Sequence, residues 1–375
     1  MDLRNVTFIL LLFVSNSYAN GYEFSAEYTA DILNVVSGGL ATGSEYLDNL
    51  DLELEVDVAE TWNVGTGRFF IHGLYNNGTR FSEDRVGDLQ VVSNIDAAKA
   101  WRLFEFWYEF GGANWSIKSG LYDLNSEFDV NQTGGIFLNS SHGIGAEFGQ
   151  TGQNGPSIFP VSSFSVRAAT SFGSSSARIA VLDGVAGDPA DSTSNEIDLS
   201  NEDGALTVAE IEIPYGESVR LWLGYWRYSA EFEEVDGSGF GRGNDGWYLG
   251  NESEFQLGSR TARWFVRFGQ ADERFNVLSG YIGLGSVIVG PIKARPTDQL
   301  GIAVASARAG DSYRDYIGQV GARPSGRETT WELTYQAQVN EHFLVQPDIQ
   351  YVRNPSLSGT LDDAWVVGCR FQFRY

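Results

Sequence analysis

Cysteine, histidine and basic side chains are scarce in this chain of 375 residues. The single cysteine, Cys369, excludes an internal disulfide framework. The three histidines, His72, His142 and His342, lie far apart and lack the spacing of a metal site. Only 25 lysines and arginines stand against 49 aspartates and glutamates, which gives a formal net charge of −24. That charge argues against nucleic acid as a partner because phosphate groups would be repelled. We therefore expect no metal and no cofactor.

Long apolar runs are also missing, apart from one at the N-terminus. Residues 6–14 are apolar except for Thr7, Arg4 precedes them, and Ser17 and Ala19 supply small residues for cleavage. This pattern is typical of a secretory signal peptide, so we expect residues 1–19 to be removed and residues 20–375 to form one mature domain. No later stretch could cross a bilayer as a helix. An exported chain that enters a membrane without such a helix must form a closed β-barrel.

Aromatic residues, at 14%, and glycines, of which there are 44, are by contrast abundant. The last twelve residues show how the aromatic residues are arranged. Apolar and aromatic residues alternate there with smaller or polar ones, and strand side chains alternate between two faces. The apolar face comprises Trp365, Val367, Cys369, Phe371, Phe373 and Tyr375. A last strand of this kind is typical of bacterial outer-membrane barrels, although an edge strand of a soluble sandwich would alternate in the same way. In a barrel, Cys369 would be a small lipid-facing residue.

The same alternation recurs along the whole chain. It marks about sixteen segments, an even number, as in bacterial single-chain barrels. The segments begin near residues 22, 50, 68, 101, 115, 161, 177, 205, 218, 245, 260, 277, 300, 329, 343 and 364, with the weakest patterns near 177, 277 and 300. The sequence therefore predicts an all-β fold, a transmembrane barrel of about 16 antiparallel strands.

The connections between these segments alternate in length. Long connections cover residues 31–49, 76–100, 123–160, 183–204, 230–244 and 308–328, and tight turns lie at 111–114, 216–217, 256–259 and 340–342. Outer-membrane barrels have short periplasmic turns and long extracellular loops. We therefore place the turns in the periplasm and loops 76–100 and 123–160 outside the cell. Residues 271–276 are too short and residues 286–299 too long for this rule.

Several segments resemble one known family, the carbohydrate-selective porins (the OprB-like family). They are GLYNNG (73–78), SNID (93–96), GLYDLNSEF (120–128), FLNSSHG (137–143), GPSIFP (155–160), DGVAGDP (183–189), GYWRY (224–228) and QPDIQYV (346–352). The resemblance covers nearly all of the mature chain, in order. It implies a sixteen-stranded outer-membrane barrel through which sugars diffuse into the periplasm.

A sugar channel needs aromatic surfaces for the apolar faces of the sugar and charged groups for its hydroxyls. In the segment 101–110, alternation predicts that Leu103, Glu105, Trp107 and Glu109 face the lumen and that Arg102 and Phe104 face lipid. The complete predicted sugar path consists of Glu105, Trp107, Glu109, Arg167, Arg220, Trp222, Trp226, Arg263 and Arg267.

Two features of this lumen have more than one interpretation. The inward acids Asp51, Glu53, Glu55 and Asp57 repel one another unless arginines or water screen them. Pairing with arginines would either stabilise the wall or give the lumen an acidic and a basic side. The inward tryptophans either line the path or pack beneath an infolded loop, for which residues 123–160 are the candidate.

Two further observations concern metal binding and catalysis. Asp123, Asn125, Glu127 and Asp129 have calcium-loop spacing, but Phe128 occupies the glycine position. This excludes an EF-hand and leaves a looser calcium site open. No nucleophile motif is present, so we expect no catalytic residues and no enzyme.

We therefore expect passive diffusion of mono- or small oligosaccharides, with a general, weakly cation-preferring porin as the alternative. An outer-membrane hydrolase or adhesin is disfavoured because no catalytic constellation appears. The expected partners are carbohydrate solutes, outer-membrane lipids and, through the C-terminal strand, the barrel-assembly machinery. A homotrimer and a monomer both fit the sequence.

Overall fold

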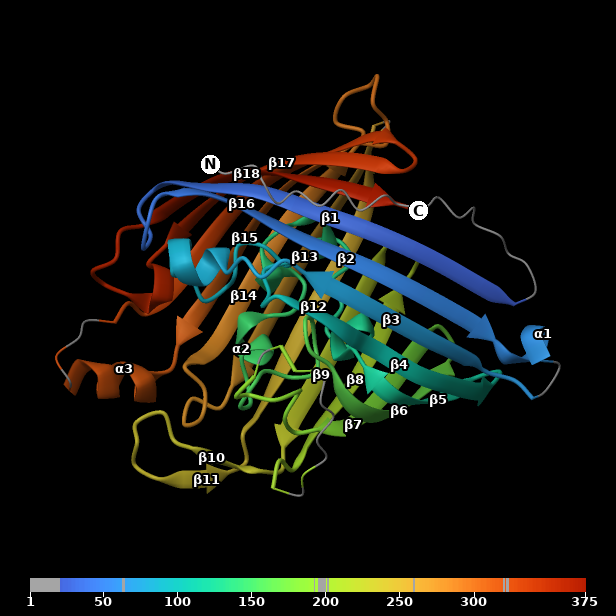
Figure 1. Cartoon of the computed structure of the whole chain (residues 1–375), viewed down its shortest axis with the longest axis horizontal. Helices are drawn as coiled ribbons and strands as arrows, with labels where there is room; N and C mark the ends of the chain where they lie inside the picture. The colour runs from blue at the N-terminus through green and yellow to red at the C-terminus, as the bar shows by residue number, and fades with distance from the viewer. Residues whose placement is uncertain are drawn as a thin grey trace.

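The computed structural model describes residues 21–62, 65–191, 193–194, 200, 202–258, 260–319, 321 and 324–375. The predicted signal peptide, residues 1–19, lies outside the described residues. The chain forms one closed antiparallel barrel of sixteen strands (Figure 1). The last strand pairs with the first, with Phe373 opposite Tyr28, and this pairing closes the barrel.

In chain order the barrel strands are β1 (Tyr22–Ser37), β2 (Gly43–Asp57), β3 (Arg68–Asn76), β4 (Ala100–Gly112), β5 (Trp115–Tyr122), β6 (Ser163–Phe172), β7 (Ser175–Asp183), β8 (Ala205–Tyr215), β9 (Val219–Tyr228), β12 (Asp245–Leu257), β13 (Arg260–Ala271), β14 (Leu278–Val289), β15 (Gln299–Ala309), β16 (Arg327–Asn340), β17 (Phe343–Arg353) and β18 (Ala364–Arg374). Strands β10 (Glu231–Glu233) and β11 (Phe240–Arg242) form a separate hairpin between β9 and β12.

Helices are short and lie in the connections. They are α1 (Val58–Trp62), α2 (Ala146–Gly149) and α3 (Asp311–Gln319), with single turns at η1 (Ser82–Val86), η2 (Leu124–Ser126), η3 (Gly134–Ile136), η4 (Ser140–His142) and η5 (Pro355–Leu357). Among the described residues, no helix has the length and apolar character needed to cross a membrane. Figure 1 shows α3 and the β10–β11 hairpin at one end of the barrel and α1 at the other. We call these the long-loop end and the short-turn end.

The predicted strand positions are confirmed throughout, including the three weak segments, which are β7, β14 and β15. The predicted loop 31–49 is wrong. Strands β1 and β2 continue to Ser37 and from Gly43, so a short hairpin joins them. The two irregular connections remain irregular: residues 272–277 join β13 to β14, and residues 290–298 join β14 to β15.

A β-bulge in β4 corrects the predicted facing of its first half. The register with β3 shifts so that His72 pairs with Glu105 while Gly73 pairs with Leu103, which leaves Phe104 as the extra residue. An extra residue reverses the alternation on one side of the bulge. Arg102 and Phe104 are therefore buried inside the barrel, and Leu103, predicted to face the lumen, is 47% exposed on the outer face.

The outer face carries aromatic rings toward both ends. At the long-loop end the ring of Tyr351 stacks between Trp331 and Trp365, with centroids 5.6 and 4.8 Å away. At the short-turn end Phe343 stacks on Phe373 at 4.5 Å. Cys369 has the same parity as Phe373 and is partly exposed. Such paired girdles are what a membrane-spanning barrel requires at its two interfaces.

Inside the barrel, two loops from the long-loop end fold back against the wall. They are residues 77–99, between β3 and β4, and residues 123–162, between β5 and β6. After Gln299, the inner face of β15 consists of small residues, which leave room for the second loop: Gly301, Ala303, Ala305, Ala307 and Ala309. Loops 76–100 and 123–160 thus begin at the long-loop end, together with the other long connections, but occupy the interior.

Candidate functional site: the interior of the barrel

Wall glutamates hold the loop of residues 123–162 across the barrel. Its backbone N–H groups donate in chain order, Asp123 to Glu105 of β4 (3.0 Å), Asp129 to Glu210 of β8 (2.7 Å), Thr133 to Glu252 of β12, and Leu138 and Asn139 to Glu332 of β16 (2.6 and 3.1 Å). Hydrogen bonds to carboxylates are the stronger class, and buried N–H groups are costly to leave unpaired. These four glutamates, the loop anchors, fix where the loop narrows the lumen.

The loop of residues 77–99 is joined to the first by backbone hydrogen bonds. Asn94 N–H donates to the carbonyl of Leu138 (2.8 Å), and Ser140 N–H donates to that of Val91 (2.9 Å). Glu328 of β16 accepts from the N–H of Leu89 and Gln90 at 3.0 and 2.9 Å. The two loops therefore form a single inner layer rather than one infolded loop.

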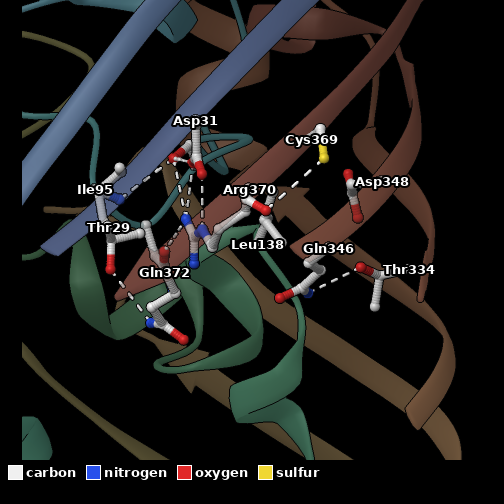
Figure 2. Close-up of polar contacts among 12 residues, drawn as sticks. Thr29, Asp31, Ile95, Leu138, Thr334, Gln346, Asp348, Cys369, Arg370 and Gln372 are labelled. Carbon is white, nitrogen blue, oxygen red and sulfur yellow. Dashed lines mark hydrogen bonds and ion pairs between the residues drawn. The ribbon is translucent and has the colours of Figure 1, made fainter. Parts of the chain in front are cut away.

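The inner layer also reaches the strand that closes the barrel. Arg370 of β18 binds both carboxylate oxygens of Asp31 in β1 at 2.8 Å, and Figure 2 shows this pair with the inner loops beside it. The same guanidinium donates to Asn94 at 2.7 Å. Nearby, Gln346 donates to the carbonyl of Ile136 at 2.6 Å. The seam between the first and last strands is thus tied to both loops.

Burial shifts the proton affinity of several groups in the inner loops. It raises the pKa of Asp88 to about 7 and, with the adjacent Glu105 carboxylate, that of Asp123 to about 7. It lowers the pKa of His142 to about 3, so this ring is neutral although its Nε2 lies 3.9 Å from Glu332. Although burial opposes ionisation, Lys118 and Arg167 hold the pKa of Glu127 below its usual value.

Trp222 and Trp226 point inward as alternation predicted, but the inner loop covers them. They are 1% and 0% exposed. The ring of Trp226 stacks on Phe148 with centroids 5.1 Å apart and planes 4° apart. The Nε1 of Trp222 donates to Asp129 at 3.3 Å. Of the two interpretations of these rings, the structure shows packing beneath the infolded loop.

Trp107 is also buried, at 7% exposed, and belongs to the same apolar cluster as Trp222 and Trp226. Its ring stacks on Phe70 at 5.1 Å and carries the ammonium of Lys118 at 4.0 Å from its centroid. Its Nε1 donates to Glu105 at 3.1 Å. Trp107 therefore packs against Lys118 and orients the loop anchor Glu105 through a hydrogen bond.

Arg267 is the most enclosed of the predicted arginines. It binds Asp129 at 2.6 Å and Glu147 at 2.7 Å, and the side chains of all three are at most 3% exposed. Its guanidinium also lies over the rings of Tyr248 and Tyr281, at 5.6 and 5.1 Å. Arg267 therefore joins the wall to the inner loop and is closed off from the lumen.

The remaining predicted charges belong to a band of ion pairs on the inner wall. It runs Glu55–Arg68–Glu109–Arg167–Glu127–Lys118, with distances of 3.2, 2.7, 2.7, 2.7 and 2.6 Å, and continues as Arg178–Glu212–Arg220–Glu252, with distances of 3.3, 3.1 and 3.0 Å. Arg178 joins the two parts because it also donates to the carbonyl of Glu127. We call this band, from β2 to β12, the charge belt. It accounts for Glu109, Arg167 and Arg220 of the predicted set.

Part of the charge belt remains open to water. The side chains of Arg68, Glu55, Glu212 and Glu127 are 48%, 34%, 25% and 23% exposed. Toward the short-turn end, a hollow of about 240 Å³ lies between residues of β1, β2 and the chain end, including Glu27, Glu53 and Arg374. Arg263 donates to Gln299 and is partly exposed. These groups can meet a polar solute.

Sequence reasoning missed Lys118, Arg178, Glu127 and Asp129. Arg178 and Lys118 could have been found from the sequence, because alternation directs both side chains inward. On the next strand, Arg178 lies opposite Glu210 and Lys118 lies opposite Arg167. Glu127 and Asp129 are in the loop, where alternation carries no information. Their carboxylates are bound by arginine and lysine, so the calcium-like spacing serves ion pairs to the wall.

Comparisons with known proteins agree with this architecture. The profile described as "Carbohydrate-selective porin, OprB family" matches residues 41–375. Porin B of Pseudomonas aeruginosa is 24% identical over 402 residues, covering 94% of this chain and 87% of that protein. The high-pH structure of Pseudomonas putida OprB is 21% identical, covers 95% of this chain and 94% of that one, and superposes with a TM-score of 0.84. A mutant of Rh. blastica porin, 12% identical over 94% of this chain and all of that one, has a TM-score of 0.55.

Proposed function

The chain belongs to the carbohydrate-selective porin, OprB family, and on that premise we propose that sugars cross the barrel along the exposed part of the charge belt. The protein is an outer-membrane porin through which carbohydrates diffuse passively. Its short-turn end faces the periplasm and its long-loop end faces the exterior. No chemical step is part of this proposal.

The observation that carries the proposal is the alternation of positive and negative side chains along the exposed part of the charge belt. Donors such as Arg68 and acceptors such as Glu55 and Glu127 lie side by side there. A sugar hydroxyl both donates and accepts, so it can exchange water for such neighbours as it passes. Trp222 and Trp226 support the inner loop from behind, and Trp107, which is 7% exposed, packs between Phe70 and Lys118 beside the belt.

Such a path must bind weakly so that the sugar can leave. We expect millimolar affinity, about 4 kcal/mol at a 1 M standard state. Arg68→Ala removes one exposed donor and leaves the anchors intact, so sugar block of single-channel current should weaken about tenfold, which corresponds to ~1.4 kcal/mol. Arg242→Ala, in the exposed Arg242–Glu231 pair of the outer hairpin, is the matched control. Unchanged block in the Arg68 variant contradicts the path.

One observation favours the alternative, a general cation-preferring porin. The side chains of Glu53 and Glu55 on β2 are 41% and 34% exposed in the lumen. A lumen lined by exposed carboxylates attracts cations whatever the sugar preference. Liposome swelling with sugars and amino acids of matched size separates the two functions, because a general porin passes both at rates set by size alone.

We further propose that the C-terminal strand is the signal read by the barrel-assembly machinery, since β18 closes the barrel through β1. Removing Tyr375, or replacing Phe373 with aspartate, should block insertion and leave secretion intact. Normal amounts of heat-modifiable protein in the outer membrane contradict this. A homotrimer or a monomer remains the expected state, and cross-linking in intact membranes distinguishes them.

A further inference from the structure

Arginines gather on the outer surface of the barrel where three consecutive strands reach the long-loop end. Arg308 of β15, Arg327 of β16 and Arg353 of β17 have the same parity as the outward Ile302, Trp331 and Ile349, and all three are exposed. Together with Arg314 of α3 they line an open hollow of about 430 Å³, which Thr329 and Asn354 complete. We call these four side chains the arginine hollow. Figure 1 shows α3 beside this end of the barrel.

The arrangement of these charges is unfavourable without a further anion. Arg308 lies directly opposite Arg327 in the strand register, and Arg353 pairs with the neighbouring Thr329. Like charges directly opposite one another destabilise a sheet. Asp311 partly compensates, at 3.1 Å from Arg308 and 3.2 Å from Arg314. Among the described residues, neither Arg327 nor Arg353 forms an ion pair. A second acid, Asp363, accepts from the backbone N–H of Asn354 at 2.9 Å, but four arginines so close together are still unusual in a chain of net charge −24.

The hollow lies at the height where lipid headgroups are expected. Two outward pairs further into the barrel wall than Arg308–Arg327, Val304, Trp331, Tyr351 and Trp365 form a continuous outward row across β15–β18, and its aromatic rings are the girdle described above. Aromatic girdles mark the membrane interface. Below the girdle, Ile302, Leu333 and Ile349 are 60%, 45% and 43% exposed toward lipid.

An arginine at the same rim of the barrel, but in a different setting, shows that the cluster is local. Arg227 ends β9 on the outer face, and its cross-strand partner is Asp245 of β12. Arg227 thus lies opposite an acid in the strand register, whereas Arg308 lies opposite another arginine. The clustering of arginine at β15–β17 is therefore not a general property of the rim.

We propose that the arginine hollow binds the phosphate groups of a phosphorylated glycolipid in the outer leaflet, with its acyl chains lying on the strip of Ile302, Leu333 and Ile349. Guanidinium groups bind phosphate through paired N–H donors, and several of them together can satisfy more than one phosphate. The lipid supplies the missing anion, and the girdle places its headgroup beside the arginines. This site is on the outer wall and is independent of the sugar path.

The test uses the folded full-length barrel in detergent and native mass spectrometry with diphosphoryl lipid A as the probe. The double variant Arg327→Ala/Arg353→Ala should weaken retention of the lipid about 25-fold, since each arginine near a lipid surface contributes about fivefold. Arg327→Lys/Arg353→Lys should recover part of this loss. Arg227→Ala is the matched control: because Arg227 is on β9 and does not line the hollow, it should change retention less than about twofold. Heat-modifiability shows that each variant is folded.

Two further arms identify the ligand. A dephosphorylated form of the same lipid should be retained no better by the wild type than by the double variant. Inorganic phosphate at millimolar concentration should leave lipid A bound. Equal loss in the Arg227 control, equal retention of the dephosphorylated lipid, or displacement of lipid A by free phosphate overturns the proposal.

Discussion

The inner wall of the barrel has a covered side and an open side. On the covered side, Arg267 meets Asp129 and Glu147 beneath the inner loop, and the side chains of both acids are 0% exposed. On the open side, Arg68 meets Glu55 with side chains 48% and 34% exposed. Both arginines lie at inward-facing positions of strands in which apolar and polar residues alternate. The sequence pattern therefore does not distinguish them. The loop that covers one and not the other makes the first a structural group and leaves the second free to meet a solute.

The two sides should also differ in how much free energy of unfolding is lost when an ion-pair partner is removed. Removing one partner of a buried ion pair leaves an uncompensated charge, whereas an exposed pair is screened by water and contributes little. The covered side should therefore respond to mutation through stability and the open side through permeation. Four experiments test that division, in order of expected effect.

The largest effect is expected for Arg267→Ala. It leaves Asp129 and Glu147 buried together without their shared cation, so the folded barrel should lose about 3–5 kcal/mol in its free energy of unfolding. Urea unfolding of the barrel in lipid vesicles, followed by tryptophan fluorescence, measures the loss. Arg267→Lys should recover part of it. A loss below about 1 kcal/mol would place Arg267 with the exposed arginines.

Glu332→Ala tests the loop anchors. It leaves the N–H groups of Leu138 and Asn139 buried without an acceptor, which should cost about 2–4 kcal/mol. Because the loop is released at one point, open-channel current should fluctuate more and its mean should rise. Glu254→Ala, on the exposed part of β12, is the control and should leave both quantities unchanged. If the open-channel current of the Glu332 variant does not fluctuate more than that of the wild type, the other three loop anchors are enough to hold the loop.

The buried carboxyls of the inner loops predict a dependence on pH. Asp88 and Asp123 have a pKa of about 7 in the folded chain and an ordinary aspartate pKa of about 3.9 when unfolded. The folded state thus holds the protons of these two carboxyls more tightly, so their contribution to stability is fully present below about pH 4 and is lost as the pH rises through 7. The slope is at most about 1.4 kcal/mol per pH unit for each group.

The corresponding measurement is the midpoint of urea unfolding between pH 5 and pH 8. The double variant Asp88→Asn/Asp123→Asn should flatten the profile, because neither side chain then titrates. The open-side substitution Glu55→Gln should leave its slope unchanged. A wild-type barrel that becomes more stable toward pH 8 contradicts the assignment.

The smallest effect on stability is expected on the open side. Arg68→Ala should change the free energy of unfolding by less than about 1 kcal/mol, because water screens the partners that remain. Ion selectivity should nevertheless move toward cations, since positive charge leaves the lumen. Reversal potentials in a salt gradient measure this shift. A large loss of stability with unchanged selectivity would remove the distinction between the two sides.

The strands were predictable from the sequence because their signal is local. Alternation located even β7, β14 and β15, and it gave the inward direction of Arg167, Arg220, Arg263 and Arg267. It failed at Leu103 and Phe104, where one extra residue in β4 reverses the faces without leaving a trace in composition. A bulge depends on pairing with β3, which no window within β4 contains.

Which residues of the inner wall are covered by the inner loop could not be predicted, because this depends on contacts between residues far apart in the chain. Trp222 and Trp226 are buried by Asp129 and Phe148, on a loop that precedes them by dozens of positions. One signal was available. From Gly301 to Ala309 the inner face of β15 has only glycine and alanine, where a water-filled lumen would be expected to show polar side chains. Such a face indicates that something else packs against it.

The loop anchors also determine the order in which the protein can fold. Glu105 and Glu332 come from opposite ends of the chain, and the hydrogen bond from Leu138 to Glu332 spans 194 residues. Contacts of such long range form only after the intervening strands have paired, since loop closure must come first. The inner layer therefore reaches its final position only when the barrel is nearly complete. We therefore expect the channel to narrow late in assembly, after β16 has joined the barrel.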